Sequence, residues 1–499
     1  MTSAVKRLVI VGGGAIAWIA AIAFLRAFRK HPPDVTLVDT GAADDAPLGH
    51  WTLPSQRGIH TLLGIKEPDL IKRTGATFKL ASEHLGWQGN GSRFLHAHGE
   101  IGPQISGAPF YKFLLIEALA GRPESPDAFS VAAKAARLGR FARPMESEQS
   151  LTSSFTYGFH LEEKSYVEYL REHAQHLGVR SFEGSISDVS LTESGNIAAL
   201  HLVDGEKVAG DLYLDCSGSK ALLMSRISAN DREDWSGWLP CDRMISMFAP
   251  AQATPPAMTQ TTAASAGWLW RAPLAAASMT GYTYGSAFQG ADAALAELRA
   301  HSPGAAGEPR VTRFRSGRRR KFWERNCIAL GTAAVELEPL AGAQLHFAQL
   351  GLATLIEVFP IDAASAVESD EYNRVMAEHA DALRDFTLAH YRAGRARPGD
   401  FWAATRAAPA PERLTHKLDL FAANARIDLL DFESFEEVDW AWLLIGSGVL
   451  PDAIELQVRM RLEKLARQMV APLRAQIQQL AASMPPHIDY VRGQTVRAR

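Results

Sequence analysis

The 499-residue sequence has few cysteines and no long hydrophobic run. Its three cysteines, Cys216, Cys241 and Cys327, are odd in number and widely spaced, which argues against a disulfide framework or a metal site and fits a reducing cytoplasm. Apolar runs of about 18 residues, the length of a membrane helix, are absent, so no membrane span is expected. Three consecutive glycines interrupt the apolar N-terminus, which argues against a signal peptide.

A strong excess of charge is also missing. The chain carries 52 Lys and Arg against 55 Asp and Glu, a formal net charge of -3. No attraction to nucleic acid or to an anionic membrane follows from this balance. The basic run at 313–323 is therefore interpreted as a solvated strand and turn that faces acidic neighbours. Hydrophobic residues make up 47% of the chain, which is typical of a globular protein with a large core.

The start of the chain contains a nucleotide-binding unit. The apolar run at 5–11 predicts a buried strand, the Ala- and Leu-rich segment at 15–29 predicts a helix, and Asp34–Asp39 predicts a second strand. A turn of three glycines joins the first strand to the helix. A strand, a glycine turn, a helix, a strand and a final acid in this order are together a strong signal for dinucleotide binding.

Each residue of the turn has a separate physical role. Gly12 permits the tight turn, and Gly14 lets the backbone approach a pyrophosphate at the N-terminus of the helix, which begins at Ala15. The small Ala17 lets the helix pack close to the strand. Asp39 ends the second strand, where its carboxylate can accept hydrogen bonds from ribose hydroxyls.

Later segments favour a flavin over a nicotinamide and indicate a discontinuous domain. A strand that ends at Asp215 and a segment that contains Gly331 are of the kind that returns to the nucleotide domain in flavin monooxygenase-like folds. The predicted fold is α/β, with a Rossmann-like FAD-binding domain, an inserted β-sheet and a helical C-terminal region. The expected boundaries are 1–90, 200–225 and 325–360 for FAD binding, 91–199 and 226–324 for the insertion, and 361–499 for the helices.

Several stretches spread over nearly the whole chain carry a family resemblance. They are "VIVGGGAIAW", "LPCDRM", "GWLWRAPL", "FRSGRRRKFWERNCIALGTAAVELEPL", "EYNRVMAEHADALRDFTLAHY" and "DWAWLLIGSGVLP". Together they resemble the flavin-dependent tryptophan halogenase family. The Trp-x-Trp-x-x-Pro element, with Trp268 and Trp270, is rather specific to that family. On its own, the same element would be two aromatic residues packed in a core.

The resemblance implies a reaction in two chambers. FADH2 made by a separate reductase reacts with oxygen, and halide is converted to hypohalous acid. The oxidant then passes through a tunnel to a lysine, which delivers an electrophilic halogen to an aromatic ring such as indole. A nearby glutamate stabilises the cationic ring and takes its proton.

Three residues match the substrate chamber of the family. Lys79 matches the catalytic lysine, which needs a low-dielectric pocket to remain a nucleophilic amine. His96 matches a pocket histidine. His98 stands where an aromatic residue is usual, so tryptophan itself is not assured as the substrate.

The sequence departs from the family at the glutamate. Members usually read Pro-Leu-Glu-Ser-Thr, whereas this chain has Ala341 at the glutamate position, followed by Gly342 and Ala343. Backbone N–H groups just beyond hold the halide in the family, and Ala343 and Gln344 could still supply them. Gln344 replaces a glycine.

A second departure concerns a strap beside the flavin, where the family has Gly-Glu-Ala-Thr leading to Pro. Gly49 and Thr52 match this pattern, whereas His50 and Trp51 do not. Trp51 could stack on the flavin or fill the space that a flavin would use.

Three functions remain open on the sequence. The first is an FADH2-dependent halogenase that acts on indole or another electron-rich aromatic, with chloride or bromide as co-substrate. The second is a flavin monooxygenase of the same fold, and the third is a degenerate homologue that binds flavin or an aromatic without turnover. The oligomeric state is open as well, with a homodimer as one candidate.

Overall fold

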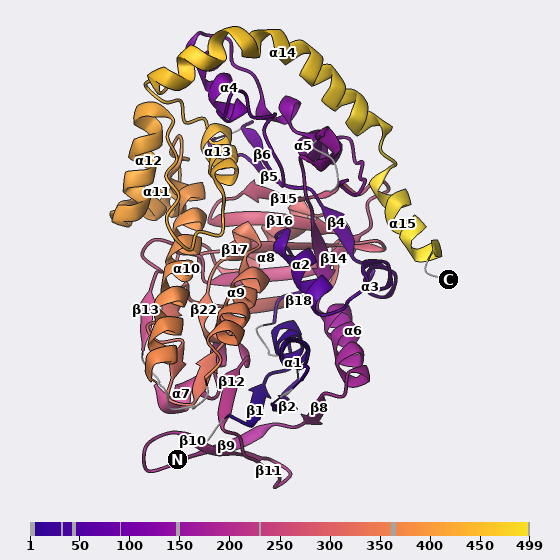
Figure 1. Cartoon of the computed structure of the whole chain (residues 1–499), viewed down its shortest axis with the longest axis vertical. Coiled ribbons are helices and arrows are strands. Elements are labelled where there is room, and N and C mark those ends of the chain that lie inside the picture. Colours follow the sequence, from indigo (N-terminus) through magenta and orange to yellow (C-terminus); the bar gives the residue numbers. More distant parts are fainter. Residues whose placement is uncertain are drawn as a thin grey trace.

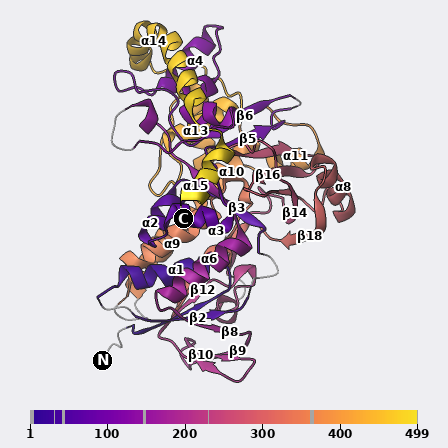
Figure 2. The same cartoon turned by 90° about the vertical axis from the view of Figure 1, so that its right-hand side faces the viewer.

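The computed structural model describes residues 5–30, 33–41, 46–89, 91–145, 150–228, 231–360 and 366–497. A parallel sheet with its covering helices lies near one end of the elongated molecule, and a large mixed sheet lies in the middle (Figure 1). The long C-terminal helix α14 (Leu456–Ser483) crosses the opposite end (Figures 1 and 2). Among the described residues, no helix is both long enough and apolar enough to cross a bilayer.

The parallel sheet gathers strands from distant parts of the chain. Its strands, in spatial order, are β20 (Trp323–Glu324), β21 (Cys327–Ala329), β12 (Leu212–Asp215), β1 (Arg7–Val11), β2 (Asp34–Asp39) and β8 (Arg180–Glu183). All neighbours pair in parallel except β20 and β21. Strands β1 and β12 are almost wholly apolar because helices cover both faces of such a sheet. Helix α1 (Ala15–Ala27) follows β1 directly.

The central sheet has seven strands and contains both tryptophans of the Trp-x-Trp element in β16. Its order is β18 (Ala306–Arg313), β14 (Arg243–Pro250), β17 (Ala277–Tyr284), β16 (Gly267–Pro273), β15 (Met258–Ala263), β5 (Ala81–Leu85) and β6 (Arg93–Ala97). Only β15 and β5 pair in parallel. Strands β5 and β6, at one edge of this sheet, therefore come from the N-terminal fifth of the chain.

A small three-stranded sheet holds two of the expected site residues. Strand β7 (Gly158–Glu162) pairs on one side with β3 (Gly49–Trp51) and on the other with β4 (Thr77–Lys79). Trp51 pairs with His160, and Lys79 pairs with Gly158. This sheet therefore fixes the strap and the lysine on either side of one strand.

Helices and short strands complete the fold. The C-terminal helices are α9 (Gln344–Glu357), α10 (Ala366–Arg392), α11 (Asp400–Ala407), α12 (Glu412–Asn424), α13 (Glu437–Gly446), α14 and α15 (His487–Arg497). The earlier helices are α2 (Ser55–Leu62), α3 (Glu67–Thr74), α4 (Phe110–Leu119), α5 (Val131–Arg137), α6 (Glu163–His176), α7 (Met224–Ile227) and α8 (Ala291–His301). The remaining strands are β9 (Ile186–Leu191), β10 (Ile197–Leu202), β11 (Lys207–Val208), β13 (Arg232–Asp234), β19 (Gly317–Arg319) and β22 (Val335–Glu336).

The sheets divide the chain differently from the expected boundaries in several places. Strand β5 lies within the expected FAD segment 1–90 but belongs to the central sheet, and β8 lies within the expected insertion but belongs to the parallel sheet. The expected boundaries rested on glycine and strand signals, which do not reveal strand partners.

The basic run at 313–323 faces carboxylates, as its interpretation required. Arg315 pairs with Asp234 at 2.5 Å, and Arg318 pairs with Glu233 at 2.9 Å and with Asp381 at 3.0 Å. These contacts pair two arginines of the run with carboxylates.

Candidate functional site

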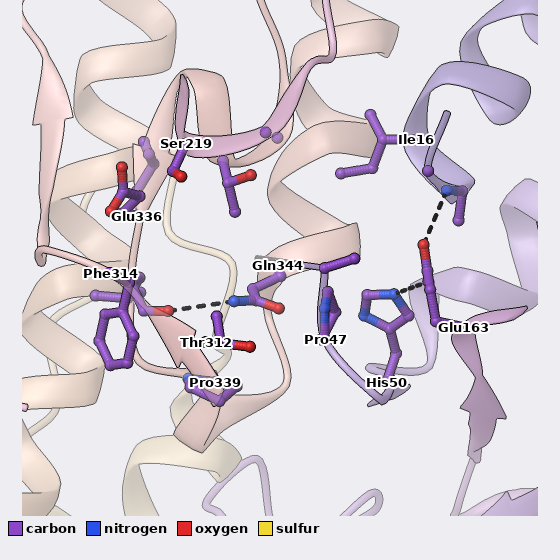
Figure 3. Close-up of a pocket in the computed structure, with 18 of the residues that line it drawn as sticks. Ile16, Pro47, His50, Glu163, Ser219, Thr312, Phe314, Glu336, Pro339 and Gln344 are labelled. Carbon is purple, nitrogen blue, oxygen red and sulfur yellow. Dashed lines mark hydrogen bonds and ion pairs between the residues drawn. The ribbon is translucent and has the colours of Figure 1, made fainter. Parts of the chain in front are cut away.

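A long cavity begins at the N-terminus of α1 and ends beside a 3₁₀ turn at Pro339–Ala341. Figure 3 shows part of its lining, with His50 and Glu163 on one side and Pro339 and Gln344 across from them. The lining comprises residues 13–16, 40–41, 46–47, His50, Glu163, 216–219, Met244, 312–314, 331–332, 335–339, Ala341, Ala343, Gln344, Phe347 and Leu383. We call this space the long cavity.

The glycine turn at the start of the long cavity is tightly packed on its protein side. Gly12 has a φ of +148°, and a Cβ there would lie 2.3 Å from the carbonyl oxygen of Cys216. At Gly13, a Cβ would lie 2.1 Å from the carbonyl oxygen of Gly41. Gly14 is different because its nearest neighbour would be a Glu163 carboxylate oxygen at 3.4 Å. Ala17 is fully buried beneath the turn.

A carboxylate that the sequence analysis missed lies at the N-terminus of α1. Glu163 Oε1 accepts a hydrogen bond from the Ala15 backbone N–H at 3.2 Å, and its Oε2 lies 2.7 Å from His50 Nε2 (Figure 3). Burial opposes ionisation of Glu163, but the contacts with His50 and Ala15 prevail and lower the pKa of this carboxyl. The strap residue His50 thus holds a carboxylate that also accepts from the N-terminus of α1.

Two expected cofactor-binding acids are held by the protein itself. Asp39 accepts a hydrogen bond from the Gly41 N–H at 2.9 Å and forms an ion pair with Arg171. Asp215 is fully buried and accepts hydrogen bonds from the N–H groups of Leu223 and Met224, both at 2.9 Å. Asp215 therefore shapes the turn whose residues 216–219 line the long cavity.

Four further residues that the sequence analysis named line the long cavity. Gly331, with a φ of +64°, lines it, as do Ala341, Ala343 and Gln344. The Gln344 side-chain amide donates to the Leu337 carbonyl oxygen at 3.3 Å.

Trp51 does not belong to the lining of the long cavity. Its side chain is only 3% exposed, and its ring lies 4.8 Å from the ring of Trp270, centroid to centroid. A Cβ at Gly342, whose φ is +69°, would lie 2.1 Å from the Trp51 carbonyl oxygen. Trp51, Trp270 and the Gly342 backbone therefore form a packed partition.

A second buried carboxylate borders the long cavity near this partition. Glu338 Oε2 accepts hydrogen bonds from the Trp268 indole N–H at 3.1 Å and from the Tyr391 hydroxyl at 2.5 Å. Burial raises the pKa of Glu338 to about 7. Sequence reasoning passed over Glu338 although it stands directly before Pro339 in a stretch that carried the family resemblance.

An open cleft lies on the other side of the strap. Residues 53–55, 98–100, 153–156, His346, 434–436, Val438 and Asp439 line it. The strap and α9 each contribute to both spaces, because His50 and Gln344 line the long cavity whereas Leu53 and His346 line the cleft.

Lys79 is buried next to His98, which lines the cleft. Its side chain is 1% exposed, and its Nζ lies 2.8 Å from His98 Nε2 and 3.4 Å from the Thr52 carbonyl oxygen. Burial lowers the pKa of Lys79 to about 7, against an opposing effect of the Asp439 charge. Burial and the neighbouring lysine also lower the pKa of His98. A substantial share of the Lys79 side chains is therefore neutral amine near pH 7.

His96 forms a second pair in the same region. Its Nε2 lies 2.8 Å from Asp439 Oδ1, and the His96 ring centre is 6.1 Å from that of His98. The other carboxylate oxygen of Asp439 accepts a hydrogen bond from the Glu436 backbone N–H at 2.8 Å, in the capping box that begins α13. Asp439 was missed as a site residue although it opens the quoted "DWAWLLIGSGVLP" stretch.

The chain matches the model of a known protein family over most of its length. The model of the tryptophan halogenase family matches residues 7–462. The chain belongs to the tryptophan halogenase family.

Individual members of the family resemble the chain over almost their whole length. The structure of BrvH, a flavin-dependent halogenase from Brevundimonas sp. BAL3, has a TM-score of 0.93 and 33% identity, with 98% of this chain and 99% of that one covered. A flavin-dependent halogenase from Xanthomonas campestris gives a TM-score of 0.92 and 32% identity, with 98% of each chain covered. Tryptophan 7-halogenase KtzQ from Kutzneria sp. (strain 744) is 25% identical over 98% of each chain.

Family membership also defines the cofactor. Tryptophan halogenases use FADH2 that a separate flavin reductase supplies. The long cavity fits such a molecule, because it runs from a helix N-terminus with open backbone at Gly14 to the partition at the 3₁₀ turn. Enzymes of this kind are oxidoreductases, and this chain shares their fold throughout.

Proposed function

We propose that this chain is an FADH2-dependent halogenase of electron-rich aromatic rings, with Lys79 as the carrier of the halogen. The observation that supports this most is the buried Lys79–His98 pair, whose histidine lines the open cleft. A lysine 1% exposed, with its pKa lowered to about 7, is a reactive amine rather than a surface charge.

The chain's own residues account for the delivery of the halogen. When bound in the long cavity, the flavin supplies the oxidising power that converts halide and oxygen to hypohalous acid. The Lys79 nitrogen attacks the halogen of that acid, an N–halogen bond forms, and hydroxide leaves with an amine proton as water. Burial disfavours the ammonium form and so keeps the electron pair of the nitrogen available. The packed rings of Trp51 and Trp270 would separate an aromatic substrate in the cleft from a flavin in the long cavity, which would disfavour direct oxygen transfer to the substrate.

We assign flavin contacts to the expected residues that line the long cavity. The backbone at Gly14 would receive the pyrophosphate beside Ala15, whose N–H donates to Glu163, while Gly331 would border the flavin and Ala343 and Gln344 would offer N–H groups to a halide. Asp39 and Asp215 would act indirectly, since their carboxylates shape the neighbouring turns.

Gly14→Val should weaken FAD binding more than tenfold, or by more than about 1.4 kcal/mol, while the fold survives. The reason is that a side chain at this position meets protein only at 3.4 Å and extends toward the proposed pyrophosphate site. Titration of flavin fluorescence measures the affinity, and thermal melting reports the fold. Gly13→Ala is the contrasting variant, because its Cβ would lie 2.1 Å from a backbone oxygen and should lower stability. Unchanged FAD affinity in Gly14→Val would place the pyrophosphate elsewhere.

The charges of the cleft bear on the substrate. Among the described residues that line it, the acidic side chains are Glu100, Glu436 and Asp439, and none of the lining residues is lysine or arginine. A substrate carboxylate would meet these like charges without a cationic partner in the lining. We therefore propose that the substrate is an indole or similar ring that lacks a free carboxylate, although several relatives are named for tryptophan.

A panel of indole, tryptamine and tryptophan tests both the reaction and this preference. The purified protein should brominate indole and tryptamine with higher kcat/KM than tryptophan when FAD, a flavin reductase, bromide and oxygen are supplied. Mass spectrometry identifies the products, and catalase removes free peroxide as a source of background bromination. A hydroxylated indole would support the monooxygenase alternative. Bound flavin without any modified ring would support the degenerate homologue.

We also propose that the enzyme works in the cytoplasm and forms a homodimer. All three cysteines are free thiols, which suits a reducing compartment. Sedimentation of the purified protein would determine its oligomeric state.

A further inference from the structure

The cleft must contain a group that takes a proton from the aromatic ring. Replacing hydrogen by halogen on a ring carbon generates a cation, and aromaticity returns only when the C–H proton leaves. Ala341 cannot serve because its methyl group has no basic atom and because it lines the long cavity, not the cleft. The base must therefore come from another part of the chain.

The polar side chains of the cleft are not equivalent as bases. His98 is engaged by Lys79, and burial lowers the pKa of His346 to about 4, so its imidazole holds a proton poorly. Glu100 and Glu436 are exposed at the cleft surface. Asp439 is more enclosed, with a side chain 21% exposed, and it is the carboxylate that contacts His96.

Resting on the proposed function, we propose that Asp439 is the catalytic base that accepts the ring proton, with His96 as its positioning partner. One oxygen of Asp439 is held by His96 at 2.8 Å and the other by the Glu436 N–H at 2.8 Å. A carboxylate fixed at both oxygens keeps its orientation toward the cleft without rearrangement. Its negative charge also stabilises the ring cation in a partly dry site.

The proposed step balances in atoms and charge. The ring carbon bonds to the halogen, the N–halogen bond breaks, and the electron pair remains on the Lys79 nitrogen. That nitrogen takes up a proton, while the ring's own proton passes to Asp439 as the C–H electrons restore the aromatic system. The hydrogen-bonded His98 provides a route for the proton to Lys79, and His96 provides one for the proton that leaves Asp439.

Asp439→Asn tests the proposal because it removes the basic charge but keeps the shape and an acceptor for the helix cap. We expect halogenation of indole to slow by about 10²-fold, the lower range for loss of a general base. A competition between indole and indole deuterated at the reacting carbon gives the second readout. Parent enzyme should use both equally, whereas Asp439→Asn should favour the protiated ring, because slow deprotonation lets the cation revert.

Glu437→Gln is the matched control, since Glu437 lies in the same first turn of α13 but does not line the cleft and accepts a hydrogen bond from the Tyr111 hydroxyl at 2.6 Å instead of contacting His96. It should retain the parent's rate and show no isotope preference. The proposal is wrong if Asp439→Asn matches the parent in rate and isotope ratio. It is also wrong if His346→Gln, and not Asp439→Asn, creates the isotope preference.

A flavin-free assay separates this proposal from the proposed function. The protein is first treated with one equivalent of hypobromous acid, freed of excess reagent, and then mixed with the indole pair. Transfer of bromine with an isotope preference only in Asp439→Asn would support the base even if flavin-driven turnover failed. Absence of transfer from the parent in both assays would overturn the base and the carrier together.

Discussion

Replacing Lys79 by methionine is expected to lower the rate of regioselective ring halogenation on the order of 10³-fold. Methionine preserves much of the length and volume of the side chain but cannot form the N–halogen bond. Production of hypohalous acid should continue, because Lys79 does not line the long cavity. A small-molecule halogen trap measures the acid, and chromatography of the indole products measures ring transfer. The loss should therefore affect only the second of these two quantities.

Lys112 offers a control for the loss of a buried lysine. It is 7% exposed and forms an ion pair with Glu455 at 3.0 Å, and it lines neither the long cavity nor the cleft. Lys112→Met should lower stability without abolishing halogenation per folded molecule. Equal rate and regioselectivity in Lys79→Met and the parent would show that free hypohalous acid, not the lysine, modifies the ring.

Replacing Trp51 by alanine should destabilise the protein by about 3–5 kcal/mol, the usual cost of removing a large buried aromatic side chain. The structure motivates this expectation because Trp51 is 3% exposed and packs against Trp270. The sequence alone left open whether Trp51 stacks on the flavin or fills the space that a flavin would use. The midpoint of denaturant unfolding and the melting temperature measure the loss.

Trp51→Phe separates packing from polarity. Among the described residues, the Trp51 indole N–H has no hydrogen-bond partner, so phenylalanine should restore most of the stability. If Trp51→Ala melts like the parent but binds FAD tenfold more weakly, Trp51 contacts the flavin and is not an ordinary core residue.

Local patterns in the sequence predicted the nucleotide unit closely. The second strand was expected at Asp34–Asp39, where β2 lies, and the helix was expected at 15–29, where α1 covers Ala15–Ala27. Periodicity suffices here because the strand, turn and helix are contiguous and their side chains pack against one another. No such pattern marks strand β6 (Arg93–Ala97), because the His and Gly residues in and around it are also common in loops, yet it forms an edge strand of the central sheet.

Local sequence patterns did not predict which side chains of the site contact one another. Lys79 and His98 were both selected through the family resemblance, but their direct contact depends on how β4 and the end of β6 meet. Asp439 lies 343 positions from His96, and Glu163 lies 113 positions from His50. Contacts over such separations follow from tertiary packing, which one sequence does not disclose without a structure.

Two sulfur atoms in the wall of the long cavity bear on the working life of the enzyme. Cys216 and Met244 both line the space in which a strong halogenating oxidant would form. Burial raises the pKa of the Cys216 thiol, which keeps it protonated and slows its reaction, but the Met244 thioether has no such protection. Each oxidant molecule that does not reach Lys79 can convert Met244 to its sulfoxide. The number of turnovers per protein molecule is then set by the ratio of two rates: transfer of the oxidant to Lys79 and oxidation of Met244.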